Sequence, residues 1–235
     1  MPKINLEFPI VDMHTHQIPV EAMANEFIVF AESPGLVKRP QDYAGFYTFG
    51  YHPWCADKVD ERIIEQEFKA RKEDPQLLAF GEMGLDRVCP IDLAQQKKIF
   101  VRQLELCKQL RAPVIVVHSV RAHMDILAIV KQTKYRGVII FHDFNGDRSD
   151  LEKLATLECE CFFSLGDNLF RHNSALIRDF GHLPKQNVFL ETDDSTRSIK
   201  EVYQRFADQS GQSLEEVTIL IYQNFMRVFG SNIFE

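Results

Sequence analysis

Short apolar runs alternate with longer amphipathic segments along the chain. Eight runs rich in β-branched and aromatic residues are predicted strands, at residues 6–13, 26–31, 45–51, 76–81, 113–118, 137–142, 160–165 and 187–192. The runs 113–118 and 137–142 are apolar up to a final histidine, as strands buried on both faces must be. Strands of this kind, separated by segments of helical length, indicate a parallel sheet with crossover helices.

The segments between the strands carry apolar residues at helical spacing. Predicted helices cover residues 92–110 and 213–229 most clearly, and 60–74, 121–132, 170–180 and 198–208 with less distinct ends. Ser213 with Glu216, and Ser149 with Glu152, fit capping boxes that open helices. We interpret these helices as scaffold.

The stretch 17–49 is too short for two regular units. It must hold two strands and their connections, whereas one βα unit takes roughly 30 residues. The pattern therefore predicts an α/β fold, a TIM-type (β/α)8 barrel with short or missing helices in the early units.

Composition fits one domain over residues 1–235. The chain has 235 residues, of which 45% are hydrophobic, enough for a large core. No apolar run approaches the roughly 18 residues of a membrane span, and Met1–Asn5 does not begin a signal peptide. We expect a cytoplasmic protein with no membrane partner, and nothing in the sequence indicates an obligate protein partner.

The spacing of the cysteines and the net charge of the chain each argue against one kind of function. The five cysteines are odd in number and lack C-x-x-C spacing, so we interpret them as reduced thiols without assigned chemistry. The net charge of −7 argues against nucleic-acid binding through a broad basic surface. It does not exclude an enzyme that acts on nucleic acid, because bound divalent cations would supply positive charge locally.

Residues able to bind metal follow five of the predicted strands. They are His14, His16, Glu82, His118, His142 and Asp193. His14 and His16 share one face of an extended segment, because side chains alternate there. In a barrel of parallel strands the carboxyl ends surround one mouth, so we expect all six side chains to converge.

This set suits two ions better than one. Four imidazoles and two carboxylates exceed the needs of one tetrahedral ion. The simplest partition gives His14, His16 and Asp193 to one ion and His118 with His142 to the other, bridged by Glu82. Imidazole-rich coordination favours zinc, manganese, nickel or iron over magnesium, and the ligands alone do not identify the metal. A water activated by the metals would attack the substrate, with Asp193 accepting its proton.

Seven motifs, in order along nearly the whole chain, carry a family resemblance. They are Asp12-Met13-His14-Thr15-His16, Gly50-Tyr51-His52-Pro53-Trp54, Gly81-Glu82-Met83-Gly84-Leu85-Asp86, His118-Ser119, Phe141-His142-Asp143-Phe144-Asn145-Gly146, Glu191-Thr192-Asp193 and Asn224 to Gly230. The chain resembles the TatD-type metal-dependent hydrolases of the amidohydrolase superfamily. The resemblance implies a TIM barrel, divalent-metal dependence and, commonly, exonuclease or other phosphodiesterase activity.

Three departures from the family pattern concern the substrate. The family's arginine two residues after the fifth-strand histidine is replaced by Val120, and Arg121 stands one place later. The segment after the E-T-D motif is cut to residues 194–197 before a helix begins, and the region before Gly50 is shortened. These losses could open the cleft or change its specificity.

The candidate substrate-binding residues are His52, Trp54 and Arg121. His52 could hydrogen-bond a phosphate or a metal-bound group and Trp54 could stack on a base, or both could simply pack the loop around Pro53. Asp12 either orients a ligand histidine or caps its turn, and Asp86 is expected to organise a turn.

Three functions remain open from the sequence. The first is a deoxyribonuclease or nucleotide phosphodiesterase acting on DNA or a small phosphodiester. The second is a hydrolase that uses the same metal site on an ester, amide or acyl-RNA carbonyl. The third is a non-catalytic metal-binding barrel.

Overall fold

The eight predicted strands form one parallel sheet that curls into a nearly closed barrel. The structure is a computed structural model that describes residues 8–18 and 26–233. The strands follow chain order around the sheet, each pairing with the next. They are β1 (Ile10–Thr15), β2 (Glu26–Glu32), β3 (Phe46–Phe49), β4 (Leu77–Asp86), β5 (Val114–Val120), β6 (Val138–Phe141), β7 (Cys161–Leu165) and β8 (Val188–Leu190).

The seam between β1 and β8 closes through the loop that follows β8. Asp193 N donates to the carbonyl of His14 at 2.8 Å, and His16 N donates to the carbonyl of Asp193 at 3.3 Å. The Asp12 carboxylate reinforces the seam by accepting hydrogen bonds from Thr192 N at 3.0 Å and Thr192 Oγ1 at 2.6 Å. Asp12 therefore fastens β1 to the end of β8.

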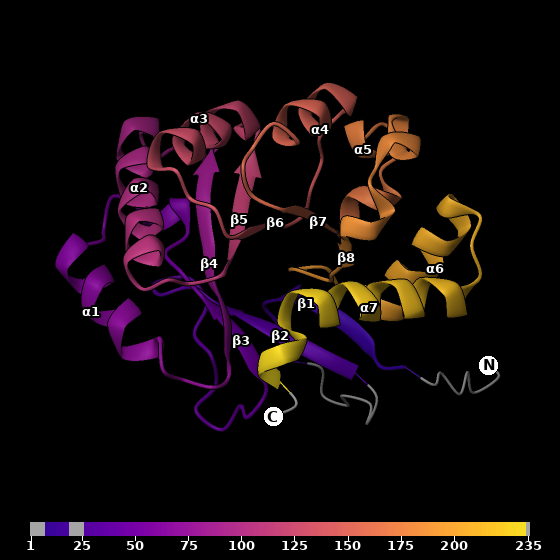
Figure 1. Ribbon diagram of the computed structural model, residues 1–235, viewed down its shortest axis with the longest axis horizontal. Helices are drawn as coiled ribbons and strands as arrows, with labels where there is room; N and C mark the ends of the chain where they lie inside the picture. The colour runs from indigo at the N-terminus through magenta and orange to yellow at the C-terminus, as the bar shows by residue number, and fades with distance from the viewer. Residues whose placement is uncertain (1–7, 19–25, 234–235) are drawn as a thin grey trace.

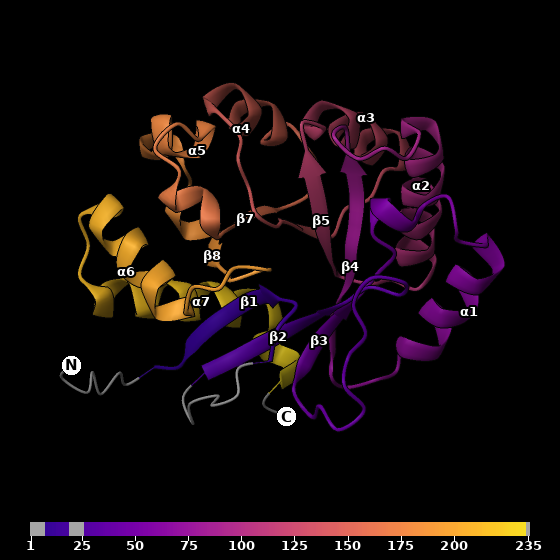
Figure 2. The same cartoon turned by 180° about the vertical axis from the view of Figure 1, so that it is seen from behind.

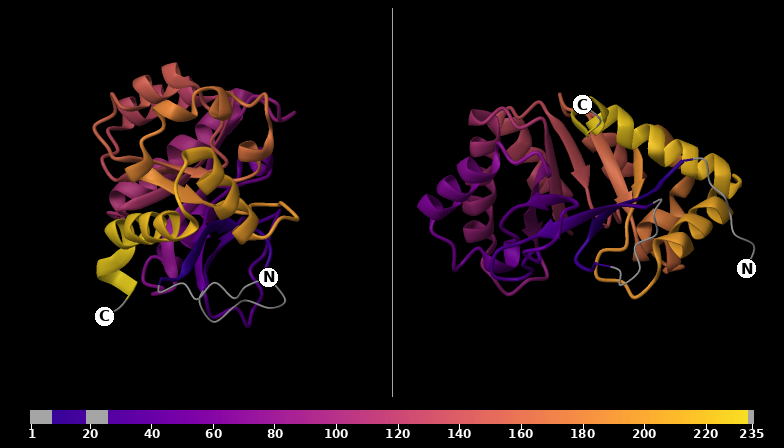
Figure 3. Two further views of the ribbon diagram at one scale, coloured as in Figure 1. Left: turned by 90° about the vertical axis from the view of Figure 1, so that its right-hand side faces the viewer. Right: turned by 90° about the horizontal axis from the view of Figure 1, so that it is seen from below.

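Helices follow most of the strands and surround the sheet. They are α1 (Glu61–Arg71), α2 (Leu93–Gln109), α3 (His123–Thr133), α4 (Arg148–Leu154), α5 (Ala175–Arg178), α6 (Ile199–Ser210) and α7 (Leu214–Ile233). Figures 1 and 3 show α1 and α2 at one end of the molecule and α6 at the other, while α7 packs against β1 and β8. No described helix lies in front of β1, β2 and β3 on the side seen in Figure 2. None of the described helices is long and apolar enough to cross a membrane.

The irregular early region was predicted correctly where the structure describes it. Residues 33–45, all described, connect β2 to β3 through turns without a helix. Part of the β1–β2 connection, residues 19–25, lies outside the described residues, as does the start of the strand predicted at 6–13. The Ser213 and Glu216 capping box is present, with Ser213 N donating to Glu216 Oε2 at 2.7 Å.

Three local predictions were wrong. The strand predicted at 76–81 continues to Asp86, so Glu82 lies within β4 and not after it. Helix α4 opens on a capping box of Asp147 and Asp150, because Asp147 takes the N-cap position two residues before Ser149. The helix predicted at 170–180 is confined to α5, flanked by short 3-10 turns.

Candidate metal centre at the carboxyl mouth of the barrel

Glu82 lies at the centre of five imidazole rings. Its Oε1 is 2.6 Å from His142 Nε2, 2.7 Å from His118 Nδ1 and 3.2 Å from His52 Nε2. Its Oε2 is 3.3 Å from His14 Nε2 and 3.5 Å from His16 Nε2. The side chain is 2% exposed. The two carboxylate oxygens thus face two separate groups of nitrogens.

Two glycines bring the backbone of Glu82 close to β5. Gly81 and Gly84 have φ of 138° and 149°, which side-chain-bearing residues rarely adopt. A Cβ on Gly81 would lie 2.3 Å from the carbonyl oxygen of Val116, and one on Gly84 would lie 2.0 Å from that of His118. The pairing of β4 with β5 shifts register between Phe80 and Met83, around Gly81 and Glu82. The G-E-x-G sequence therefore permits the close approach that sets Glu82 against His118.

In three of the histidines, the ring nitrogen that points away from Glu82 lies near a carbonyl or a carboxylate. The other ring nitrogen of each faces Glu82 and is placed to bind a cation. His16 Nδ1 lies 3.0 Å from the Ala31 carbonyl, so in the neutral ring Nδ1 carries the proton and the lone pair of Nε2 faces Glu82. His118 Nε2 lies 3.5 Å from Asp86 Oδ2, and His142 Nδ1 lies 3.5 Å from Glu191 Oε1. Carboxylates or carbonyls behind ligand histidines are typical of metal sites.

His52 has the opposite tautomer. Its Nδ1 accepts a hydrogen bond from Trp54 N at 3.2 Å, so in the neutral ring the proton sits on Nε2. That Nε2 faces Glu82 Oε1 and lies 3.2 Å from His118 Nδ1. His52 is thus arranged as a hydrogen-bond donor within the cluster.

Asp193 is a partly exposed carboxylate of the cluster. Its Oδ1 lies 3.5 Å from His16 Nε2 and 3.9 Å from His14 Nε2, and its side chain is 29% exposed. Its φ of 51° is left-handed, an uncommon conformation for a residue other than glycine, and occurs where the chain turns after β8.

The electrostatics of the cluster fit a cation. Burial alone would raise the pKa of Glu82, but the charges of His142 and His52 and hydrogen bonds from His118 and His14 hold it well below its ordinary value. Burial would lower the pKa of His142, yet Glu82 and Glu191 raise it well above its usual range. His118 Nδ1 and His142 Nε2 are also only 3.0 Å apart, and both face Glu82 Oε1. A cation bound between these donor atoms would satisfy them together.

Four groups of donor atoms among the described residues lie close enough to share an ion. The donor atoms of each group lie within 4.8 Å of one another: His14, His16 and Glu82; His14, His142 and Asp193; His52, Glu82 and His118; and His16, Asp193 and the exposed Asp194. These donors are imidazole nitrogens and carboxylate oxygens, which suit zinc, manganese, nickel or iron. The residues present therefore fit a divalent metal centre.

Sequence comparison identifies the family. The model of the TatD-related DNase family matches residues 20–230. The chain belongs to this TatD-related DNase family. The resemblance inferred from the motifs is confirmed, and the chain is a metal-dependent hydrolase of the TatD type.

Curated relatives carry hydrolase and nuclease names. An uncharacterized metal-dependent hydrolase of Methanocaldococcus jannaschii is 28% identical over 205 residues, 80% of this chain and 76% of the relative. The 3'-5' ssDNA/RNA exonuclease TatD of Erwinia tasmaniensis is 32% identical over 120 residues, 50% of this chain and 45% of the relative. The human 3'-5' RNA nuclease TATDN2 is 38% identical over 87 residues, 36% of this chain and 11% of the relative.

Solved structures of TatD proteins share the fold. A TatD homolog from Escherichia coli aligns with a TM-score of 0.77 at 19% identity, covering 94% of this chain and 98% of the homolog. A TatD family hydrolase from Entamoeba histolytica aligns with a TM-score of 0.75 at 13% identity, covering 95% and 99% of the two chains. At these identities the likeness concerns the fold, and it confirms the TIM-type barrel.

The structure brings all six predicted metal-binding residues of this TatD family member to one point. Of the three predicted substrate-binding residues, only His52 lies inside this cluster. His52 lies inside the cluster, Trp54 is 52% exposed beside it, and Arg121 is exposed directly after β5. Sequence reasoning missed the contact of His52 with Glu82. It also missed Glu191, which is fully buried and has Oε1 3.5 Å from His142 Nδ1.

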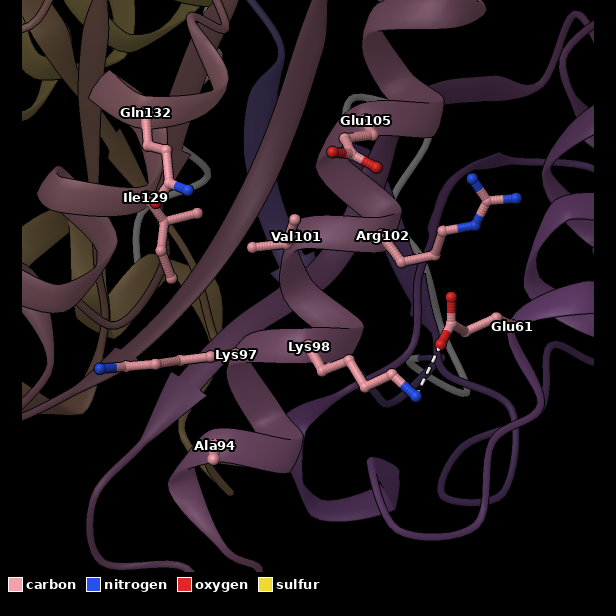
Figure 4. Close-up of a pocket in the computed structure, with 9 residues that line it drawn as sticks. All are labelled: Glu61, Ala94, Lys97, Lys98, Val101, Arg102, Glu105, Ile129 and Gln132. Carbon is pink, nitrogen blue, oxygen red and sulfur yellow. Dashed lines mark ion pairs between the residues drawn. The ribbon is translucent and has the colours of Figure 1, made fainter.

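A separate groove of about 400 Å³ lies on the outer face of α2, away from the cluster (Figure 4). Its basic side chains are neutralised by acidic partners. Lys98 Nζ lies 2.9 Å from Glu61 Oε1, Lys97 Nζ lies 2.6 Å from Asp125 Oδ1, and Arg102 pairs with Glu65. The groove therefore offers an anion no free positive charge among its described residues.

Proposed function

We propose that this TatD family member uses two divalent ions to hydrolyse a phosphodiester bond in DNA or a small nucleotide. The observation that carries the proposal is the position of Glu82, whose two oxygens face two different groups of histidines. A carboxylate in that position could bridge two cations. Two-metal sites of this kind stabilise both the attacking and the leaving oxygen of an in-line displacement.

The ligands divide between the two oxygens of Glu82. His14, His16 and Asp193 would hold one ion on the side of Oε2, and His118 with His142 would hold the other on the side of Oε1. When bound, divalent ions neutralise phosphate charge and lower the pKa of a coordinated water. Zinc, manganese, nickel and iron are all compatible with this donor set.

Asp193 is proposed as the general base. Glu82 is almost fully buried and surrounded by imidazoles, whereas the Asp193 side chain is 29% exposed and can meet a water beside the substrate. Burial also raises the pKa of Asp193 above its usual value, which brings it toward the range useful for proton transfer near neutral pH. Glu82 is therefore proposed as a metal ligand and Asp193 as the group that accepts the proton of the water.

His52 and Arg121 are proposed to contact the phosphate. The tautomer of His52 places a donor N–H toward the cluster. Arg121 is exposed and forms no ion pair with the described residues, whereas Arg87 pairs with Asp125 and Arg197 pairs with Asp167. Arg121 is therefore the available cation of the three beside the mouth.

A substrate screen tests this function. The purified protein, loaded with manganese or zinc, is assayed on bis(p-nitrophenyl) phosphate, on single-stranded oligonucleotides and on p-nitrophenyl acetate. Phosphodiester hydrolysis that depends on added metal is expected, with loss of activity in Asp193→Ala. Hydrolysis of the acetate ester alone would refute the proposal and favour the carbonyl alternative. Absence of any hydrolysis by metal-loaded protein would favour the non-catalytic one.

A further inference from the structure

We propose that Trp54 and Val88 form an apolar subsite that binds one unpaired nucleobase of the substrate beside the metal centre. This inference rests on the proposed phosphodiesterase function and extends it to recognition of the base. Trp54 is 52% exposed and Val88 is 62% exposed. Both follow strands whose carboxyl ends form the mouth, β3 and β4.

One carboxylate fixes both residues of the subsite. Trp54 Nε1 donates to Asp86 Oδ2 at 2.7 Å, while Val88 N and Cys89 N donate to Asp86 Oδ1 at 2.7 and 3.1 Å. The indole edge and the turn after β4 are thereby held to opposite oxygens of the same side chain. The ring is preorganised although half of its surface is exposed, and such exposure of a rigid aromatic ring suits stacking on a base.

The subsite is joined to the metal centre through the same carboxylate. Asp86 Oδ2, which accepts from the Trp54 indole, also lies 3.5 Å from His118 Nε2. His118 turns its other nitrogen toward Glu82. A base stacked on Trp54 is therefore held one side chain away from the residues that would bind the scissile phosphate.

Two cations beside the subsite, Arg87 and Lys97, have acidic partners. Arg87, between Asp86 and Val88, donates from Nε to Asp125 Oδ2 at 2.9 Å, and Lys97 Nζ lies 2.6 Å from the other oxygen of Asp125. Arg87 and Lys97 therefore have acidic partners, and the exposed side chains of Trp54 and Val88 present apolar surface. This surface suits the face of a base better than a phosphate.

The test compares two substrates that differ only in the base. One is a short single-stranded oligonucleotide, and the other is the same oligonucleotide with its terminal base removed. Trp54→Ala is expected to raise KM for the intact substrate roughly 5- to 100-fold, the effect of losing one stacked base. KM for the abasic substrate should stay the same. Val88→Ala should give a smaller change in the same direction, and Trp54→Phe, which keeps a ring, should restore most of the base dependence.

Controls separate this inference from the proposed function. Ile63→Ala removes an apolar side chain that is 49% exposed on α1, and it should affect neither substrate. Bound metal is quantified in every variant and should not change. An equal effect of Trp54→Ala on both substrates would overturn the subsite while leaving the phosphodiesterase proposal intact. Failure of the wild-type protein to cleave either substrate would overturn both.

Discussion

Replacement of Glu82 by glutamine should abolish tight binding at both metal positions. The substitution keeps the size of a side chain that is 2% exposed and removes its charge. At an effective dielectric constant of about 20, two unit charges 4 Å apart interact by about 4 kcal/mol. Since Glu82 faces ligands of both ions, the expected loss is on the order of 4 kcal/mol for each, or about a thousandfold in Kd.

Metal competition against a chromophoric chelator measures this loss. Wild-type protein and Glu82→Gln are stripped of metal, titrated with zinc, and checked for bound metal after gel filtration. Glu32→Gln is the matched control, because Glu32 is also buried but pairs with Arg39 and Arg71 at the end of β2. Two equivalents bound by Glu82→Gln with a Kd within threefold of the wild type would refute the bridging role.

Three further predictions concern catalysis, pH and backbone geometry. Asp193→Asn should lower kcat by roughly 10²- to 10⁴-fold, the usual contribution of a general base, with little change in KM; steady-state kinetics that show an unchanged kcat would contradict the assignment. Burial would lower the pKa of His16 in the metal-free protein, but Glu82 and Asp193 raise it from its usual 6.5 to about 9. A raised histidine pKa stabilises the fold fully below pH 6.5, and this stabilisation is lost as the pH rises through 9. Metal-free protein should therefore lose roughly 3 kcal/mol of unfolding free energy across that window. Urea unfolding at several pH values measures this, and a flat profile would count against it. Gly84→Ala should lower the free energy of unfolding by more than about 2 kcal/mol. The new Cβ would lie 2.0 Å from the carbonyl oxygen of His118, and the φ of 149° at this position is strained for alanine. Gly181→Ala, where a Cβ meets nothing within 4 Å, should differ little in a thermal melt.

The barrel could be predicted because its strands are buried on both faces. Runs such as 113–118 and 137–142 are apolar at every position before the terminal histidine, and this pattern distinguishes them from amphipathic helices. The ligands could be predicted because parallel strands end at one mouth, so positions after strands converge without any knowledge of packing.

Other parts of the site depend on contacts that no local pattern encodes. The extension of β4 to Asp86 follows from glycines that let its backbone press against β5, whereas glycine in a strand-like sequence ordinarily indicates a break. The donor role of His52 depends on the backbone N–H of Trp54, which fixes its tautomer. Glu191 lies 3.5 Å from His142 Nδ1 because it directly follows β8. The two residues are far apart in the sequence, so no local pattern predicts this contact.

The position of bound metal tests the central claim most directly. Crystals of the protein loaded with zinc, measured at the zinc absorption edge, should show two anomalous peaks on either side of Glu82, one beside His14 and His16 and the other beside His118 and His142. Anomalous density absent from this cluster, or found only elsewhere on the molecule, would contradict the two-metal account.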